Sequence, residues 1–126
     1  SFDGEAILTA GDGVGVGKVF HYINGKFDYH QRVYSLSNFK NSDGKYIYYY
    51  FSMYFMKEAQ KYNAKTSVDS VRREMITKMQ IPIPCLKEQK KISSFLSSID
   101  KLVEKEQQKL DLLKEQKKAF MQQMFI

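Results

Sequence analysis

The strongest pattern in the chain is a repeat of apolar residues along its last third. From residue 92 onward, ten positions follow the alternating four-three spacing of a coiled-coil seam, and eight of them are apolar: Ile92, Leu96, Ile99, Val103, Leu110, Leu113, Phe120 and Met124. Glu106 and Lys117 occupy the other two positions. A helix from about Leu86 to Met124 is roughly 58 Å long, which is too long for the rest of the chain to cover. The pattern therefore predicts a helix that needs a partner.

The first forty residues have the short apolar alternations that are typical of β-strands. We expect strands over residues 5–9, 18–23, 26–29 and 32–36, with Asn24-Gly25 as a two-residue hairpin turn before the third. The segment from Gly11 to Gly17 holds four of the seven glycines of the chain. Such a segment can turn tightly between the first two strands and can let another backbone approach closely.

Two helices and an extended passage are expected between the strands and the long helix. Residues 45–62 place apolar and aromatic side chains at helical spacing, namely Ile47, Phe51, Tyr54, Phe55, Ala59 and Tyr62, although Tyr48-Tyr49-Tyr50 would also suit a strand. A shorter helix is expected from about Val71 to Lys78, with Ser70 as its N-cap. Pro82 and Pro84 limit residues 81–84 to an edge strand or an extended passage. The pattern predicts an α+β protein with a small β-rich domain and packed helices over 1–84, followed by a long coiled-coil-type helix over 85–126.

Composition narrows the class of protein only a little. The chain has 126 residues, a formal net charge of +6 and a single cysteine, Cys85, which excludes an internal disulfide. We find no signal peptide and no apolar run long enough for a membrane span, so a cytoplasmic protein is expected. Because the chain starts at Ser1 in what looks like a strand edge, we also expect material upstream. The basic excess favours a polyanionic partner, although lysine-rich helices are also common on solvated surfaces.

Sequence motifs for catalysis or for cofactor binding are missing. The glycine segment does not fit a dinucleotide fingerprint, because Val16 and Lys18 stand where its last glycine is needed. It does not fit a P-loop either, because Asp12 and Val19 occupy required positions. His21 and His30 have no cysteine near them and no metal-ligand spacing. We therefore expect no metal, no cofactor and no enzymatic activity.

Several polar and basic segments contain the residue types that bind DNA. They supply the candidate contacts Lys18, His30, Gln31, Arg32, Lys65, Thr66, Ser67, Arg72 and Arg73. Arg and Lys neutralise phosphates, Gln reads adenine, Arg reads guanine, and a helix N-terminus accepts phosphate. An alternative stays open, in which Arg72 and Arg73 only pair with Asp69 and Glu74 on a solvated helix.

The junction before the long helix points to a family. Together with Gly11–Lys18, the aromatic helix and Arg72–Lys78, it resembles the specificity subunit of type I restriction-modification enzymes. In that family a target recognition domain ends in a strand that reads like Ile-Pro-Leu-Pro-Pro, and Leu-x-Glu-Gln-x-x-Ile then begins a long conserved helix. Residues 81–84 and Leu86–Ile92 match this junction. Cys85 departs from it, because the second proline of the pair usually stands there.

The resemblance implies a non-catalytic DNA recognition subunit or a fragment of one. Residues 1–84 would be a target recognition domain that lacks its N-terminal part, and residues 85–126 the conserved spacer helix. The implied partners are double-stranded DNA, the methylation and restriction subunits, and a second specificity chain or another copy of this chain, bound through the helix. Glu106 and Lys117 would then fix register or antiparallel orientation, at some loss of stability. The alternative is a truncated helix-pairing module that does not bind DNA by itself.

Overall fold

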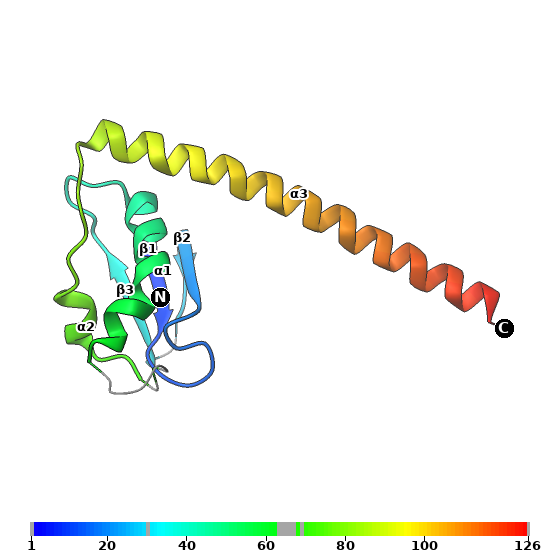
Figure 1. Ribbon diagram of the computed structural model, residues 1–126, viewed down its shortest axis with the longest axis horizontal. Helices are drawn as coiled ribbons and strands as arrows, with labels where there is room; N and C mark the ends of the chain where they lie inside the picture. The colour runs from blue at the N-terminus through cyan, green and yellow to red at the C-terminus, as the bar shows by residue number, and fades with distance from the viewer. Residues whose placement is uncertain (1, 30, 63–67, 69, 126) are drawn as a thin grey trace. The chain divides into compact units, whose positions relative to one another are not determined.

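The computed structural model describes residues 2–29, 31–62, 68 and 70–125. The chain divides into two compact units, residues 1–93 and residues 94–126. The first unit is an α+β domain (Figure 1), and the second is formed by most of one long helix. The predicted fold class is confirmed.

A three-stranded antiparallel sheet forms the centre of the first unit. Its strands are β1 (Phe2–Ala10), β2 (Phe20–Phe27) and β3 (Val33–Ser37), arranged in the order β2-β1-β3. Because β1 has a neighbour on each side, its residues 6–9 are buried. The expected strands at 5–9 and 32–36 are confirmed, and β1 is longer than expected.

The expected hairpin turn at Asn24-Gly25 is wrong. Both residues lie inside β2, where Asn24 is opposite Glu5 and Gly25 is opposite Gly4. Gly25 has φ 143° and Gly4 has φ 151°, a backbone region that favours glycine. A type I′ turn needs residues with positive φ, but here the positive φ of Gly25 occurs inside the paired strands β1 and β2. Residues 26–27 therefore continue β2, and the separate third strand at 26–29 does not form.

The glycine segment makes the tight connection between β1 and β2. Gly13, Gly15 and Gly17 have φ values of 78°, 90° and 71°, which a residue with a Cβ atom rarely adopts. This backbone turns Val16 into the core, where it is 7% exposed. The expectation of a tightly turned loop is confirmed.

Helix α1 (Gly44–Gln60) supplies most of the core that covers the sheet (Figure 1). The Asp43 carboxylate caps it by accepting a hydrogen bond from the Tyr46 backbone N–H at 3.0 Å. Phe51 and Phe55 are buried, and their rings stack at 4.6 Å between centroids. Burial of each ring stabilises the fold by roughly 2–3 kcal/mol. The expected helix is confirmed, except that Tyr54 is exposed instead of joining the buried face.

The short helix α2 (Arg73–Thr77) begins later than expected. Its N-cap is Arg72, which makes no capping hydrogen bond with its side chain, so the predicted Ser70 cap is wrong. Ser70 instead forms an isolated β-bridge with Asp12. This tertiary pairing holds Ser70 and Val71 in an extended segment, and the helix can start only after it.

The passage from α2 to helix α3 (Leu86–Met124) is held by side-chain hydrogen bonds. Residues 81–84 form no strand, so of the two predicted alternatives the extended passage is the one observed. The Tyr46 hydroxyl donates to the Pro82 carbonyl at 2.7 Å. Gln89, which is fully buried, donates through Nε2 to the Pro84 carbonyl at 2.7 Å and accepts from the Asp43 N–H at 2.8 Å. Gln89 therefore ties the start of α3 to the start of α1.

Helix α3 has the bounds that its heptad pattern predicts. Cys85 stands just before it and accepts the hydrogen bond of the Gln89 backbone N–H at 3.0 Å, so the missing proline does not prevent the helix start. None of the helices in the described part of the chain is long and apolar enough to cross a bilayer.

Candidate nucleic-acid interface

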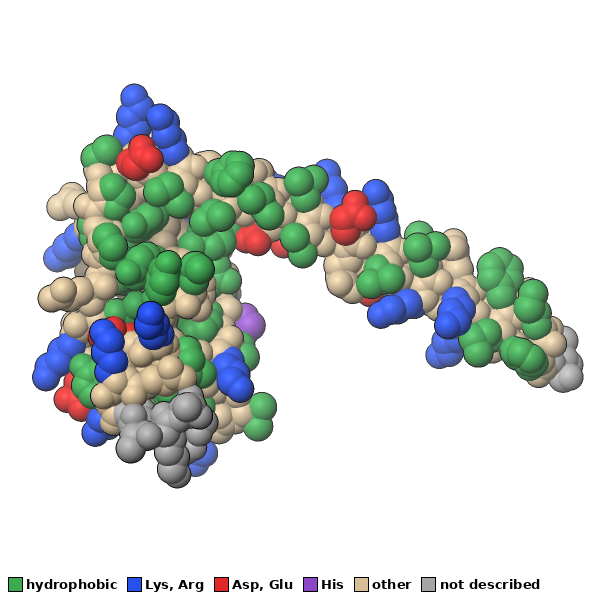
Figure 2. Space-filling model, viewed as in Figure 1, with side chains coloured by type: hydrophobic (Ala, Val, Ile, Leu, Met, Phe, Trp, Pro, Cys, Tyr) green, Lys and Arg blue, Asp and Glu red, His purple; other side chains and the backbone are tan. Residues whose placement is uncertain are grey.

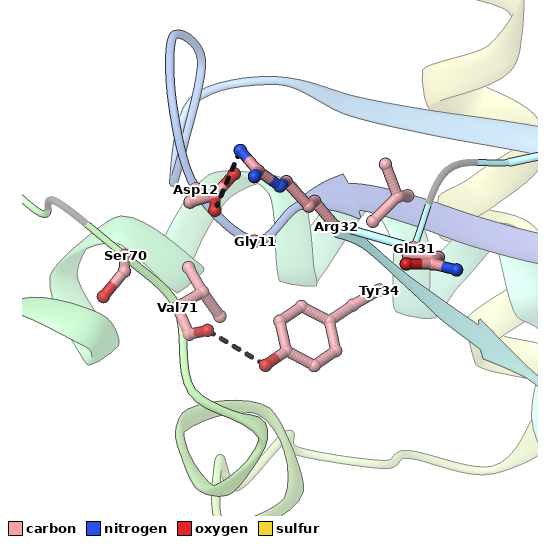
Figure 3. Close-up of a pocket in the computed structure, with 8 residues that line it drawn as sticks. Gly11, Asp12, Gln31, Arg32, Tyr34, Ser70 and Val71 are labelled. Atoms are coloured by element: carbon pink, nitrogen blue, oxygen red, sulfur yellow. Dashed lines mark hydrogen bonds and ion pairs between the residues drawn. The ribbon is translucent and has the colours of Figure 1, made fainter.

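A polar hollow of about 320 Å³ opens where three segments of the first unit meet (Figure 3). The segments are the start of the glycine loop, the entrance of β3 and the extended stretch before α2. Together they line the hollow with Gly11, Asp12, Gln31, Arg32, Val33, Tyr34, Ser70 and Val71. Of the predicted DNA contacts, Gln31 and Arg32 thus line the hollow, and Arg72 follows its last lining residue in the chain.

Backbone hydrogen bonds around Gly11 fix the walls of this hollow. The Gly11 N–H donates to the Arg32 carbonyl at 2.6 Å, and the Gly11 carbonyl accepts from the Val71 N–H at 2.7 Å. The Tyr34 hydroxyl donates to the Val71 carbonyl at 3.0 Å (Figure 3). A Cβ atom at position 11 would lie 2.7 Å from the Arg32 carbonyl oxygen, so only glycine permits this close approach.

The charges in the hollow are exposed and only loosely paired. The Arg32 guanidinium lies 3.8 Å from the Asp12 carboxylate, and the two side chains are 81% and 45% exposed. An ion pair that is so exposed to water contributes little to stability, about 0–1 kcal/mol. Arg32 can therefore turn to a phosphate or to a base edge without a large penalty.

Arg72 and Arg73 flank the hollow on the side of α2. The Arg72 guanidinium lies 3.5 Å from the Glu74 carboxylate and 5.8 Å from the centre of the Tyr62 ring. Part of the alternative interpretation is thus observed, because Arg72 does pair with Glu74. Arg73 lines a second hollow, of about 540 Å³, which shares Tyr34 with the first. The short α2 makes a weak phosphate site by itself, because a helix dipole builds up over several turns.

The other predicted contacts are less closely grouped. Lys18 is exposed at the end of the glycine loop, where its backbone N–H donates to the Gly15 carbonyl at 3.0 Å. His30, Lys65, Thr66 and Ser67 lie outside the described residues. Among the described residues, no group of three or more His, Cys, Asp or Glu side chains is placed to hold a metal ion.

Of the lining residues that were not among the predicted contacts, Tyr34 and Asp12 are the two whose side chains bond to other residues of the hollow. Tyr34 stands two positions after Arg32, which directly precedes β3, so the alternation of an extended chain would put both side chains on one side of the strand entrance. That spacing could have indicated Tyr34. Asp12 gave no such signal, because its pairing with Arg32 depends on the register of β1 against β3.

The second candidate surface is the apolar face of α3, which Figure 2 shows as patches of hydrophobic side chains along the helix. All seam residues beyond Leu96 are exposed, and Val103 and Leu113 are each 61% exposed. Phe95 and Leu102 lie beside the seam and are also exposed, which widens the apolar face in its first half. An exposed apolar face of this length indicates a protein-binding surface.

A small α+β domain with a polar hollow, followed by a long helix with an exposed apolar seam, defines a protein with two candidate binding surfaces. The chain belongs to the type I restriction modification DNA specificity domain family, whose model matches residues 1–115. Family membership confirms the resemblance that the junction indicates.

Two relatives from Methanocaldococcus jannaschii match this chain. The MjaVIII specificity subunit of a type I restriction enzyme is 32% identical over 80 residues, which cover 63% of this chain and 19% of the relative. A protein named for the MjaX type I restriction enzyme specificity subunit is 32% identical over 82 residues, which cover 64% and 19%. The chain thus spans about a fifth of the length of the curated relatives that it matches. No solved structure matches it significantly.

Proposed function

We propose that this chain recognises double-stranded DNA as part of the specificity subunit of a type I restriction-modification system. The observation that supports this most directly is the polar hollow, which joins Gln31 and Arg32 to the segment before Arg72 in a member of this family. A loop-built hollow with Gln and Arg at its mouth suits contact with base edges and phosphates.

The roles of the individual residues follow from their chemistry. Gln31 and Arg32 have side chains suited to base contacts, with His30 and residues 65–67 as further readers. Lys18, Arg72 and Arg73 are suited to phosphates, which fix the register on the duplex but carry no sequence information. The chain itself is non-catalytic in this proposal, and methyl transfer and cleavage belong to the partner subunits.

The long helix provides the assembly surface in this proposal. Residues 85–126 act as a spacer whose seam pairs with a second specificity chain or with a copy of this chain, and which contacts the methylation and restriction subunits. Residues 1–84 act as the recognition domain. The alternative is a helix-pairing module without its own DNA binding, which the exposed seam would also suit.

Salt dependence separates these two functions. If Arg32, Arg72 and Arg73 contact phosphates or bases of the duplex, affinity should fall steeply as salt rises, because binding releases counterions. Each phosphate contact removed by substitution with Ala should lower the slope of log K against log salt by about one. The measurement is a fluorescence titration of duplex DNA with the chain bound to its methylation subunits.

Lys105→Ala provides a matched control, because Lys105 is an exposed cation on α3 outside the proposed DNA surface. It should leave the slope unchanged. Binding that does not respond to salt, or slopes that Arg32→Ala, Arg72→Ala and Arg73→Ala all leave intact, would favour the pairing module. Mapping of methylated bases in a genome with and without the chain would then identify the target sequence.

A further inference from the structure

The seam of α3 carries two opposite charges that are eleven residues apart. Glu106 and Lys117 both stand at seam positions, where coiled coils normally place apolar residues. Both are exposed, and the Glu106 carboxylate lies 3.4 Å from Lys109 within the same helix. The side chains of Glu106 and Lys109 are 73% and 72% exposed, so the contact between them is weak and leaves the Glu106 carboxylate accessible to another cation.

The two charges discriminate between the ways in which two copies of α3 can pair. In a parallel, in-register pair each seam residue faces its own counterpart. Glu106 would then face Glu106, and Lys117 would face Lys117. Like charges at two seam positions disfavour that arrangement.

In antiparallel pairs, each register brings a different set of seam residues together. Glu106 meets a seam lysine in only one of them, because the chain has a single lysine on the seam. That register is centred between Asp111 and Leu112. It places Glu106 of each helix opposite Lys117 of the other, so a symmetric pair gains two interhelical ion pairs.

The same register makes every other layer between residues 99 and 124 apolar. Leu110 then faces Leu113, Val103 faces Phe120, and Ile99 faces Met124, each layer occurring twice by symmetry. The small Val103 opposite the large Phe120 is the kind of volume matching that fills a helical interface. The apolar layers follow from the charge pairing, because Glu106 and Lys117 are the two polar residues of the ten-residue seam and in this register they face each other.

We propose that α3 pairs with α3 of a second copy of this chain, antiparallel, with Glu106 of each copy against Lys117 of the other. This deepens the helix-pairing part of the proposed function and rests on it. The two polar residues interrupt the apolar seam, and in return they define orientation and register, because any shift leaves both charges against apolar neighbours.

Charge reversal tests the register. Glu106→Lys or Lys117→Glu alone places like charges at both former ion pairs and should weaken dimerisation of the chain about 30-fold. The double variant Glu106→Lys/Lys117→Glu restores both pairs with their signs exchanged and should recover wild-type affinity. Analytical ultracentrifugation over a concentration series measures the dimerisation constant, and circular dichroism checks that each variant keeps its helix.

Matched controls come from positions one or two residues away from the seam charges. Glu104→Lys and Lys118→Glu make similar charge changes at exposed positions off the seam and should leave dimerisation within about threefold of wild type. A parallel pair would give a different result, because its single variants would bind no worse than wild type. Single variants that dimerise as well as wild type, or a double variant that is not rescued, would overturn the proposed register.

The single cysteine reports orientation directly. Cys85 is exposed and precedes α3 by one residue, so a label on it marks one end of the helix. In the proposed register the two Cys85 positions lie about 80 Å apart along the helices, whereas a parallel pair brings them within about 10 Å. Distance measurement between spin labels on the wild-type dimer should therefore show no short distance. A short distance would contradict the antiparallel orientation.

Failure of this inference is distinguishable from failure of the proposed function. A chain that stays monomeric at every concentration but retains salt-sensitive DNA binding with its methylation subunits would overturn self-pairing alone. Heterodimers with another specificity chain, formed in place of homodimers, would also overturn it. A dimer with the expected charge dependence but without salt-sensitive DNA binding would support the pairing and contradict DNA recognition.

Discussion

Gln89 shows how one side chain can connect two helices of this domain. It is fully buried, and its amide bridges the N-cap residue of α1 and the carbonyl of Pro84. A buried side-chain amide stabilises the structure when both its oxygen and its nitrogen are hydrogen-bonded. If the amide is removed, the buried groups that it bonded are left without partners, which lowers the free energy of unfolding. The glutamine of the Glu-Gln motif thus has a structural role inside the domain, before the part of α3 that could contact a partner.

Replacing Gln89 by Leu should destabilise the domain by about 3 kcal/mol, because the Asp43 N–H and the Pro84 carbonyl both lose their partner in a buried site. Urea unfolding followed by circular dichroism measures the change. The matched control is Gln108→Leu, at an exposed position of the same helix, where a change within about 0.5 kcal/mol is expected. Equal effects of the two substitutions would mean that the buried amide is not the cause.

Tyr22 gives the domain a pH dependence on the alkaline side. Its hydroxyl donates to the Glu5 carboxylate, and burial, this hydrogen bond and the negative charges of Glu5 and Asp43 raise the pKa of Tyr22 well above 10. In the unfolded chain the same hydroxyl loses its proton near pH 10. The folded state therefore keeps a proton that the unfolded state releases, and the contribution of Tyr22 to stability should fall as the pH rises above 10.

The test compares unfolding free energies of wild type and Tyr22→Phe from pH 8 to pH 11. The stability of the variant should fall less steeply above pH 10, so that the gap between the two proteins narrows. Glu5→Gln keeps an acceptor for Tyr22 but removes the charge, and should give an intermediate slope. Parallel curves for wild type and Tyr22→Phe would show that Tyr22 does not retain its proton.

At the scale of elements, the helices could be predicted from the sequence because their signals are local. Apolar spacing over many turns defines α1 and α3, and α3 begins and ends at the expected residues. The five-residue α2 has too few turns to show a period, and its start depends on the bridge between Ser70 and Asp12. That contact joins residues far apart in the sequence, so cap preference alone could not reveal it.

The strands were harder to predict than the helices, because their conformation depends on contacts with distant residues. Asn24-Gly25 has the composition of a hairpin turn, but its conformation is decided by Gly4 and Glu5 across the sheet. The candidate site is similar, because Gln31 and Arg32 could be predicted as a polar strand entrance. Their meeting with Gly11 and Val71 follows from hydrogen bonds that the finished sheet creates. Local sequence can therefore suggest which residues bind, while the sheet register determines which of them share a hollow.

At the scale of the whole molecule, the proposed functions of the two units are coupled if the helices pair. A dimer would present two recognition domains, and a duplex that reaches both would bind with the added strength of a second, intramolecular contact. In the proposed register the helical parts alone separate the two Cys85 positions by about 80 Å, which equals roughly 24 base pairs of B-form DNA. A duplex of about 12 base pairs is roughly half this length, whereas one of about 40 base pairs exceeds it.

Duplex length should therefore distinguish wild type from variants that cannot pair. Wild type should bind a duplex of about 40 base pairs roughly 100-fold more tightly than one of about 12, well beyond the few-fold gain from extra overlapping sites. Glu106→Lys should retain only that few-fold gain, and the double charge reversal should restore the full ratio. Fluorescence titrations at one salt concentration, with the methylation subunits present, measure all three proteins. We expect the short duplex to bind one recognition domain at a time, so its affinity should be the same for all three proteins. A loss of that affinity would mean that the substitution damages DNA contact instead of pairing.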